Sequence, residues 1–229
     1  MFKSGLLDSV ALQHGIHRLA AGWTLISSLA AAHAPDPWLG LIDDGALRRF
    51  VEEKPNAPVL LVGGHIGPPV VLQSRLSRIA PDIHCLSSNG AFWLSRTVTD
   101  RFIPAHAPSR ALLSVFDRLR QGDSVFIGAD GLLGARNMSG QVFGHRTRWA
   151  SGAAMLALRT SAVVVGCHAL WQGDRMTISI VPGPKPREAV SPAAWLAAFS
   201  DWYSQMIEGI LRADPANYRP NSYRYFGLD

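Results

Sequence analysis

Short apolar runs alternate with amphipathic segments along the chain, and these runs predict strands. Three of them carry no charge and are dominated by Val, Leu, Ile and Ala, which is typical of strands buried on both faces of a parallel sheet. They occupy 59–62, 124–129 and 162–170. A shorter run predicts a strand at 83–86, and 176–181 predicts the antiparallel partner of 162–170 across the tight turn Gln172-Gly173-Asp174.

Between these runs, apolar residues recur at three- and four-residue spacing, which predicts helices. We expect them over 6–34, 45–53, 70–79, 109–121 and 151–159, with a long one after Ser191 that ends before Pro215. Asp43 and Asp44 are placed to cap the second helix, and Ser109 is the expected N-cap of the fourth. Strands that alternate with helices predict an α/β fold with a mostly parallel central sheet flanked by helices.

The length of 229 residues suits one α/β domain with a sizeable core. We see no internal repeat and no low-complexity linker. We therefore expect a single domain, 1–229, with an apolar or amphipathic helical segment at 1–35, an α/β core at 57–190, and a C-terminal helix with an aromatic, basic tail at 191–229.

Hydrophobic residues make up 48% of the chain and charged residues only 17%, with a mean hydropathy of +0.10. Either the core is therefore large, or part of the surface is apolar and contacts lipid. The least polar segment, 19–32, is too short and too polar for a membrane span, which needs roughly 20 apolar residues. Two interpretations remain for the first helix: it packs on the domain, or it lies in a membrane interface.

The formal net charge of +5 and a pI near 9.7 favour an acidic partner, such as an anionic lipid or an acidic carrier protein. The basic residues are dispersed, so we expect no nucleic acid. Cys85 and Cys167 lie in apolar contexts and are expected to be buried thiols, although a disulfide stays open. The chain has no CxxC motif or Cys/His cluster, and no metal site is predicted.

The stretch 57–71, APVLLVGGHIGPPVV, carries the main candidate for chemistry. His65 follows the strand and lies between Gly63-Gly64 and Gly67-Pro68-Pro69. Glycines let the backbone turn sharply and approach a ligand closely, and open α/β sheets bind ligands at the carboxyl ends of their strands. His65 is either a hydrogen-bonded core histidine or a functional one. We take it as the candidate catalytic residue, with Gly64 and Gly67 as candidate substrate-binding residues.

Further candidates follow the strand expected at 124–129. Asp130 stands at its carboxyl end, and Arg136 lies in the Gly-rich loop GLLGARNMSG. Arg146 and Arg148 precede Ser151, which can open a helix whose N-terminal amides favour an anion. We therefore predict substrate-binding roles for the three arginines and Ser151. The plainer alternatives are a carboxylate that caps local N–H groups and solvated surface arginines.

Five blocks occur in order: LLVGGHIGPP, DRLRQGDSVFIGADGLLG, GQVFGHRTRWASGAAMLALRTSAVVV, WQGDRMTISI and DPANYRPNSYRYF. Together they resemble the bacterial lipid A biosynthesis acyltransferases, the lauroyl/myristoyl transferases within the lysophospholipid acyltransferase superfamily. The resemblance implies a glycerolipid-acyltransferase-like fold. It also implies acyl transfer from a thioester of acyl carrier protein (ACP) or coenzyme A (CoA).

In that family a histidine and an acid five positions later, H-x4-D/E, form the catalytic pair. The histidine takes the proton from the acceptor hydroxyl, and the acid fixes its tautomer. The fifth residue after His65 is Val70, so this chain departs from the pattern. Another acid could orient His65, with Asp130 as the first candidate, or the nucleophile could be an amine or thiol that needs less assistance. Alternatively, catalysis is lost and the protein binds acyl chains or carrier protein.

We therefore expect an acyltransferase that moves an acyl chain from a carrier-protein or CoA thioester to a hydroxyl or amine of a lipid or small molecule. His65 is its predicted general base and Asp130 the support for that base or a ligand of the acceptor. No cofactor beyond the donor substrate is predicted. We expect a cytoplasmic protein in peripheral contact with the inner membrane. A thioester hydrolase or cyclase is the weaker alternative.

Overall fold

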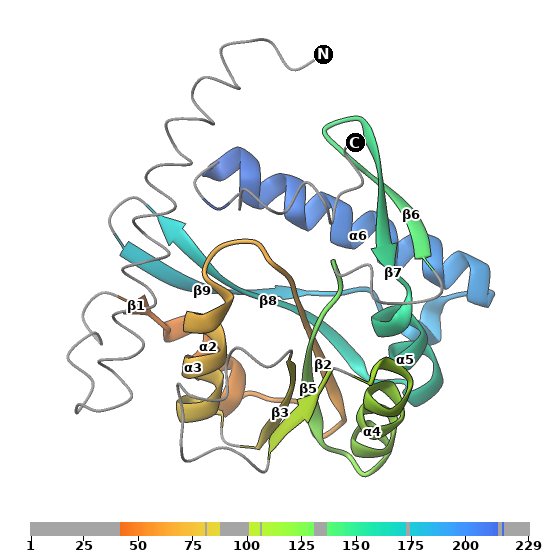
Figure 1. Ribbon diagram of the computed structural model, residues 1–229, viewed down its shortest axis with the longest axis horizontal. Helices are drawn as coiled ribbons and strands as arrows, with labels where there is room; N and C mark the ends of the chain where they lie inside the picture. Colours follow the sequence, from red (N-terminus) through yellow and green to blue (C-terminus); the bar gives the residue numbers. More distant parts are fainter. Residues whose placement is uncertain are drawn as a thin grey trace.

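The computed structural model describes residues 42–80, 82–87, 101–105, 107–130, 137–172, 175–214 and 217. Within these ranges the main sheet has seven strands in the order β1-β9-β8-β2-β5-β3-β4 (Figure 1). Its strands are β1 (Ile42–Asp43), β2 (Val59–Gly63), β3 (Ile83–Ser87), β4 (Phe102–Pro104), β5 (Ser124–Gly128), β8 (Val163–Gln172) and β9 (Arg175–Pro182). A separate two-stranded sheet consists of β6 (Asn137–Val142) and β7 (His145–Ala150).

The main sheet is mostly parallel, as the sequence predicts. Strand β2 lies at its centre and pairs in parallel with β8 on one side and β5 on the other. Strands β8 and β9 form the expected antiparallel pair. All five residues of β2 are buried, because its apolar run has neighbours on both edges and both faces. The register pairs Gly63 with Gly128, so β2 and β5 end at the same edge of the sheet.

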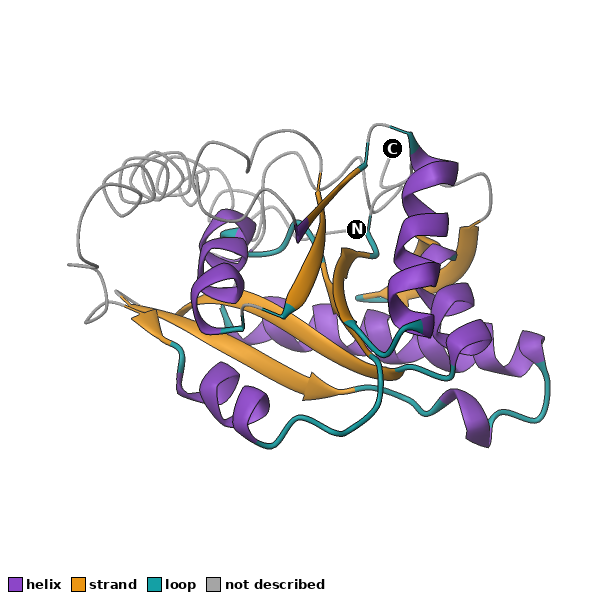
Figure 2. Cartoon of the chain, turned by 90° about the horizontal axis from the view of Figure 1, so that it is seen from below, coloured by secondary structure: helices purple, strands orange, loops and turns teal. Residues whose placement is uncertain are grey.

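Helices cover both faces of this sheet (Figure 2). They are α2 (Gly45–Glu52), α3 (Pro69–Ile79), α4 (Pro108–Arg120), α5 (Gly152–Thr160) and α6 (Pro192–Ala213), with a 3-10 turn η4 at Pro186–Glu188. Helices α2 and α3 pack on one face through Leu47, Leu72 and Leu76. Helices α4, α5 and α6 pack on the other face, where Trp195 and Phe199 of α6 are completely buried.

The predicted helices between residues 45 and 213 are confirmed with small shifts at their ends, whereas the helix expected over 6–34 lies outside the described residues. The assignment of Ser109 as an N-cap is wrong. Ala107 is the N-cap of α4, and Pro108 occupies the first turn. Proline suits that position because its fixed φ is already helical and the N–H it lacks would have no partner within the helix.

The hairpin of β6 and β7 is absent from the sequence prediction, which placed Asn137–Gly140 in a Gly-rich loop. Alternate residues of β6 are buried, namely Met138, Gly140 and Val142, as a strand with one covered face requires. Phe143 and Gly144 both have positive φ, 52° and 79°, which suits a tight two-residue hairpin turn. The covered face packs on α6, where Ser200 Oγ donates to the carbonyl of Ser139 at 2.7 Å (Figure 1).

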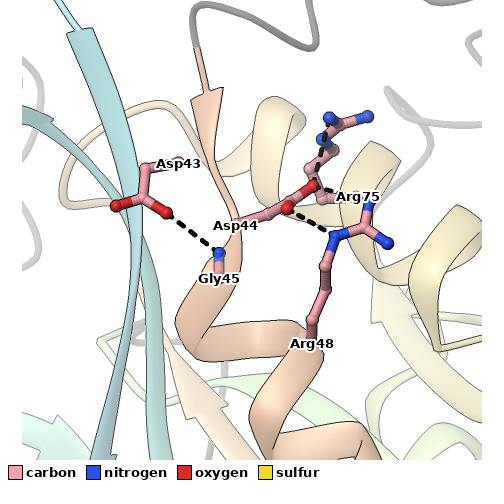
Figure 3. A network of polar contacts seen from close by, with 5 residues as sticks. All are labelled: Asp43, Asp44, Gly45, Arg48 and Arg75. Carbon is pink, nitrogen blue, oxygen red and sulfur yellow. Dashed lines mark hydrogen bonds and ion pairs between the residues drawn. The ribbon is translucent and has the colours of Figure 1, made fainter.

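A buried carboxylate fixes α2 against α3 (Figure 3). Asp44 is 8% exposed and lies 2.7 Å from Arg48 of α2 and 3.1 Å from Arg75 of α3, which is itself 3% exposed. Asp44 is the N-cap residue, but its side chain makes no capping bond; Asp43 accepts the N–H of Gly45 instead, at 3.0 Å. The Asp44 carboxylate therefore serves to position α3, which follows His65 in the chain.

Both cysteines are free and buried, as expected from their apolar contexts. Burial raises the pKa of the Cys85 thiol to about 12, which makes it a weak nucleophile. No helix in the described part of the chain combines the length and the apolar character needed to cross a membrane.

Candidate active site

His65 and Asp130 meet just beyond the carboxyl ends of β2 and β5. Each lies two residues past the paired glycines Gly63 and Gly128. Nδ1 of His65 is 2.9 Å from Oδ1 of Asp130, and the backbone N–H of His65 donates to Oδ2 of the same carboxylate. The Asp130 side chain is completely buried, whereas that of His65 is 40% exposed. The pair therefore joins a buried acid to an imidazole that solvent can reach.

The contact has a direct chemical consequence for the imidazole. A carboxylate beside Nδ1 favours the tautomer that carries its proton on Nδ1, which leaves the lone pair of the neutral ring on Nε2. The two N–H groups of His65 also satisfy both carboxylate oxygens of Asp130, as a buried charge requires. This arrangement can accept a proton at Nε2 and stabilise the resulting imidazolium. The contact between the two residues is a structural fact, and their catalytic roles stay predictions.

Tyr203 of α6 supports the backbone that precedes His65. Its hydroxyl donates to the carbonyl of Gly63 at 2.9 Å, and the N–H of Ala129 donates to the same carbonyl at 3.0 Å. Burial, together with the charge of Asp130, raises the pKa of Tyr203 well above its usual range, so the hydroxyl stays a donor. Nothing in the helical periodicity of α6 indicates the hydrogen-bond partner of Tyr203, and sequence reasoning missed this residue.

Gly64 lies where this cluster leaves no room for a side chain. A Cβ at Gly64 would lie 2.5 Å from the Tyr203 hydroxyl and 2.6 Å from Oδ2 of Asp130. Both neighbours are buried and hydrogen-bonded, so neither can move without loss of a contact. Glycine at this position is required by packing.

We expect Gly64→Ala to lower the free energy of unfolding by about 1–3 kcal/mol, the usual cost of overpacking a core. Gly209→Ala is the matched control, because a Cβ at Gly209 meets nothing within 4 Å and the residue is helical. The control should be neutral or more stable by up to about 1 kcal/mol. Urea denaturation of the two variants and the wild type measures the difference. Equal stabilities for the two variants would contradict the packing seen around Gly64.

A second histidine, His168 of β8, is buried near the same acid. It is 1% exposed, and its Nε2 has no hydrogen-bond partner among the described residues. Burial lowers the pKa of His168 to about 4, although the negative charge of Asp130 opposes this shift. Sequence reasoning did not select His168, because no partner stands at a recognisable spacing from it in the chain.

His168 should make the protein less stable in mild acid. Its folded-state pKa of about 4 lies below the ordinary value of 6.5, so the unfolded chain binds the extra proton first as the pH falls. The free energy of unfolding should drop by up to about 3 kcal/mol between about pH 6.5 and pH 4 on this account. Urea denaturation at several pH values measures the loss. His168→Leu removes the titrating group and should flatten this part of the profile; an unchanged profile would refute the assignment.

The residues predicted to bind an anion lie on β7 and at the start of α5, except for Arg136. Arg146 and Arg148 are on β7, a strand that the sequence did not predict, and both are exposed. The N–H of Ala150 donates to the carbonyl of Ala129 at 3.2 Å, so the end of β7 lies beside Asp130. Ser151 is the N-cap residue of α5, but it is 8% exposed and its side chain makes no capping bond. Arg136 lies outside the described residues.

Two further positions that bear on the prediction follow His65 in the chain. Gly67 lies in the turn after His65 with a φ of +63°. Val70, where the family motif has its acid, is in the first turn of α3. In the described ranges, no group of three or more His, Cys, Asp or Glu side chains is arranged to hold a metal ion.

Comparison with known proteins places the chain in a family. Residues 98–219, more than half of the sequence, match the profile described as bacterial lipid A biosynthesis acyltransferase. The chain belongs to this family. The matched range of this acyltransferase includes Asp130, Arg146 and Arg148, whereas His65 lies upstream of it. The resemblance described from the sequence blocks is thereby confirmed.

Other comparisons add little to the acyltransferase assignment. No curated protein matches the chain. One solved structure that is similar to it is the crystal structure of the 1-acyl-sn-glycerophosphate (LPA) acyltransferase PlsC from Thermotoga maritima. It has 13% sequence identity and a TM-score of 0.44, over 86% of this chain and 90% of that chain. That likeness is too distant to carry a function over.

Proposed function

We propose that this acyltransferase moves an acyl chain from an ACP or CoA thioester to a hydroxyl or amine acceptor, with His65 as general base and Asp130 as the acid that orients it. The observation that carries the proposal is the 2.9 Å contact between His65 Nδ1 and Asp130 Oδ1. The carboxylate that the family motif would supply at Val70 comes here from Asp130, two residues beyond β5.

In this reaction the acceptor O–H or N–H attacks the thioester carbonyl, and Nε2 of His65 takes the proton as the new bond forms. The C–S bond then breaks, and the imidazolium returns the proton to the departing thiolate. The Asp130 carboxylate stabilises the imidazolium. General base assistance of this kind contributes about 10²–10⁴ in rate.

The arginines of β7 are the proposed binding groups for an anionic part of a substrate. Arg146 and Arg148 are exposed on the outer face of the hairpin, and the end of that strand lies beside Asp130. A guanidinium presents a planar fork of donors that matches phosphate or carboxylate. Arg136, Ser151, Gly64 and Gly67 complete the proposed substrate-binding set. An anionic donor or lipid would also suit the net charge of +5. Attraction of this positive charge to anionic lipid would place the protein peripherally on the cytoplasmic face of the inner membrane.

Mass spectrometry of acyl thioesters tests the proposal. Acyl-ACP and acyl-CoA donors of several chain lengths are incubated with wild type in the presence of a lipid and metabolite extract. Loss of the acyl group with a matching acylated product establishes transfer and names the acceptor. Release of free acid without an acceptor would establish hydrolysis instead. Thioesters that stay intact while binding the protein would establish the binding function left open by the sequence.

A further inference from the structure

The turn that carries His65 is anchored two residues after the histidine by Asn217, the last residue that the structure describes. The N–H of Gly67 donates to the backbone carbonyl of Asn217 at 2.8 Å. Asn217 follows α6 and is 1% exposed. The short turn from β2 into α3 is therefore held before His65 by Tyr203, at His65 by Asp130, and after it by Asn217.

The side chain of Asn217 bonds to the part of β8 that extends beyond its pairing with β2. The register between β2 and β8 ends at Val62 and Gly166, but β8 continues to Gln172. Beyond that point the amide of Asn217 pairs with Trp171, whose N–H donates to Oδ1 at 2.7 Å and whose carbonyl accepts from Nδ2 at 3.1 Å. Nδ2 also donates to the carbonyl of Asp214 at 3.3 Å. One amide thus ties the end of α6 to β8.

The turn lies directly against this anchored strand. A Cβ at Gly67 would collide with the carbonyl oxygen of Ala169 in β8 and would lie 3.3 Å from Oδ1 of Asn217. Gly67 also has a φ of +63°, a conformation that side chains disfavour. The position of the turn on β8 therefore depends on both the missing side chain of Gly67 and the bonds of Asn217.

We infer that Asn217 is a positioning residue of the active site, which holds the His65 turn on β8 so that the imidazole meets Asp130. Asn217 acts through Gly67 and does not touch the reacting atoms. Its effect on turnover rests on the proposed function, whereas its effect on the imidazole does not.

The test compares Asn217→Ala with Ser200→Ala. Ser200 is also 1% exposed and also donates to a backbone carbonyl, but its bond at 2.7 Å goes to the hairpin at Ser139. The first readout is the tautomer of His65 without substrate, from long-range ¹H–¹⁵N NMR of histidine-labelled protein in the basic range where imidazole is neutral. His65→Gln assigns the signals. The second readout is kcat and KM for acyl transfer.

We expect wild type and Ser200→Ala to hold a proton on Nδ1 of His65, and Asn217→Ala to show a mixture of both tautomers. Displacement of a catalytic group by about 1 Å costs about 10² in rate, so kcat should fall by about that factor while KM is unchanged. A pure Nδ1–H tautomer in Asn217→Ala, with the kcat of Ser200→Ala, would overturn the inference.

Asn217→Ser covers the case in which Asn217→Ala does not fold. It keeps the backbone carbonyl that accepts from Gly67 and adds no charge, and its shorter side chain with a single donor cannot make all three bonds of the Asn217 amide. The same two changes are expected in smaller degree, and their absence counts against the inference. If wild type transfers no acyl group and the Asn217 variants still change the tautomer of His65, the proposed function is refuted and the role of Asn217 stands.

Discussion

His65→Ala is expected to lower kcat for acyl transfer by about 10³–10⁴, near the upper end of what general base assistance contributes. The imidazole is the proposed proton acceptor, and its solvent-reaching side chain is held by a buried carboxylate. Binding of the donor should change little, since the proton transfer is made only in the transition state. Thiol release from an acyl-CoA or acyl-ACP donor measures kcat, and equilibrium binding of the donor measures affinity.

His84→Gln is the matched control for this substitution. His84 lies near the amino end of β3, at the opposite edge of the sheet, where its Nε2 is 3.4 Å from Asp123. The structure thus offers a second histidine–aspartate pair that should not affect turnover. If His65→Ala and His84→Gln had the same kcat as wild type, His65 would not be the base.

Asp130→Asn is expected to lower kcat by about 10⁴, as the corresponding change does in serine proteases. The two oxygens of Asp130 face two N–H groups of His65, the ring Nδ1–H and the backbone N–H. An asparagine amide offers one oxygen and one NH₂ group. If the NH₂ group faces the backbone N–H, two donors oppose each other; if it faces Nδ1, it selects the tautomer with its proton on Nε2. Neither orientation keeps a good base.

Both kcat and the NMR tautomer of His65 measure this outcome, with Asp123→Asn as the control at the other edge of the sheet. The amide is similar in size to the carboxylate, so the loss should exceed what a change in stability explains. An Asp130→Asn enzyme with wild-type kcat, and with Nδ1 still protonated, would show that another group orients His65.

The apolar pattern of the sequence determines much of this fold and part of the site. Buried strands and amphipathic helices were predictable because burial on two faces or on one leaves a different periodicity. His65 and Asp130 were predictable as candidates because each follows such a strand. That they touch depends on β2 and β5 being neighbours, and the order of strands in a sheet leaves no local mark in the sequence.

The residues that sequence reasoning missed share that dependence on long-range contacts. Tyr203 and Asn217 hold the His65 turn through the backbone groups of Gly63 and Gly67. Because almost every residue has the same backbone groups, such contacts leave no signal in the sequence. The hairpin was missed for a different reason. Its alternating pattern was present, but Gly140 stands at a buried position, where it leaves room for Trp149 and Ser204, and its small size disguises the apolar face.

The long separation in sequence between His65 and its acid also affects when the active site can form during synthesis. His65 and Asp130 are 65 residues apart, and β8, α6 and Asn217 follow later still. Contacts of this range form late in folding, because long loops must close before any contact rewards them. A nascent chain that has just released His65 from the ribosome therefore still lacks Asp130. Recovery of activity after refolding should report completion of the tertiary structure, whereas circular dichroism would register the individual helices earlier.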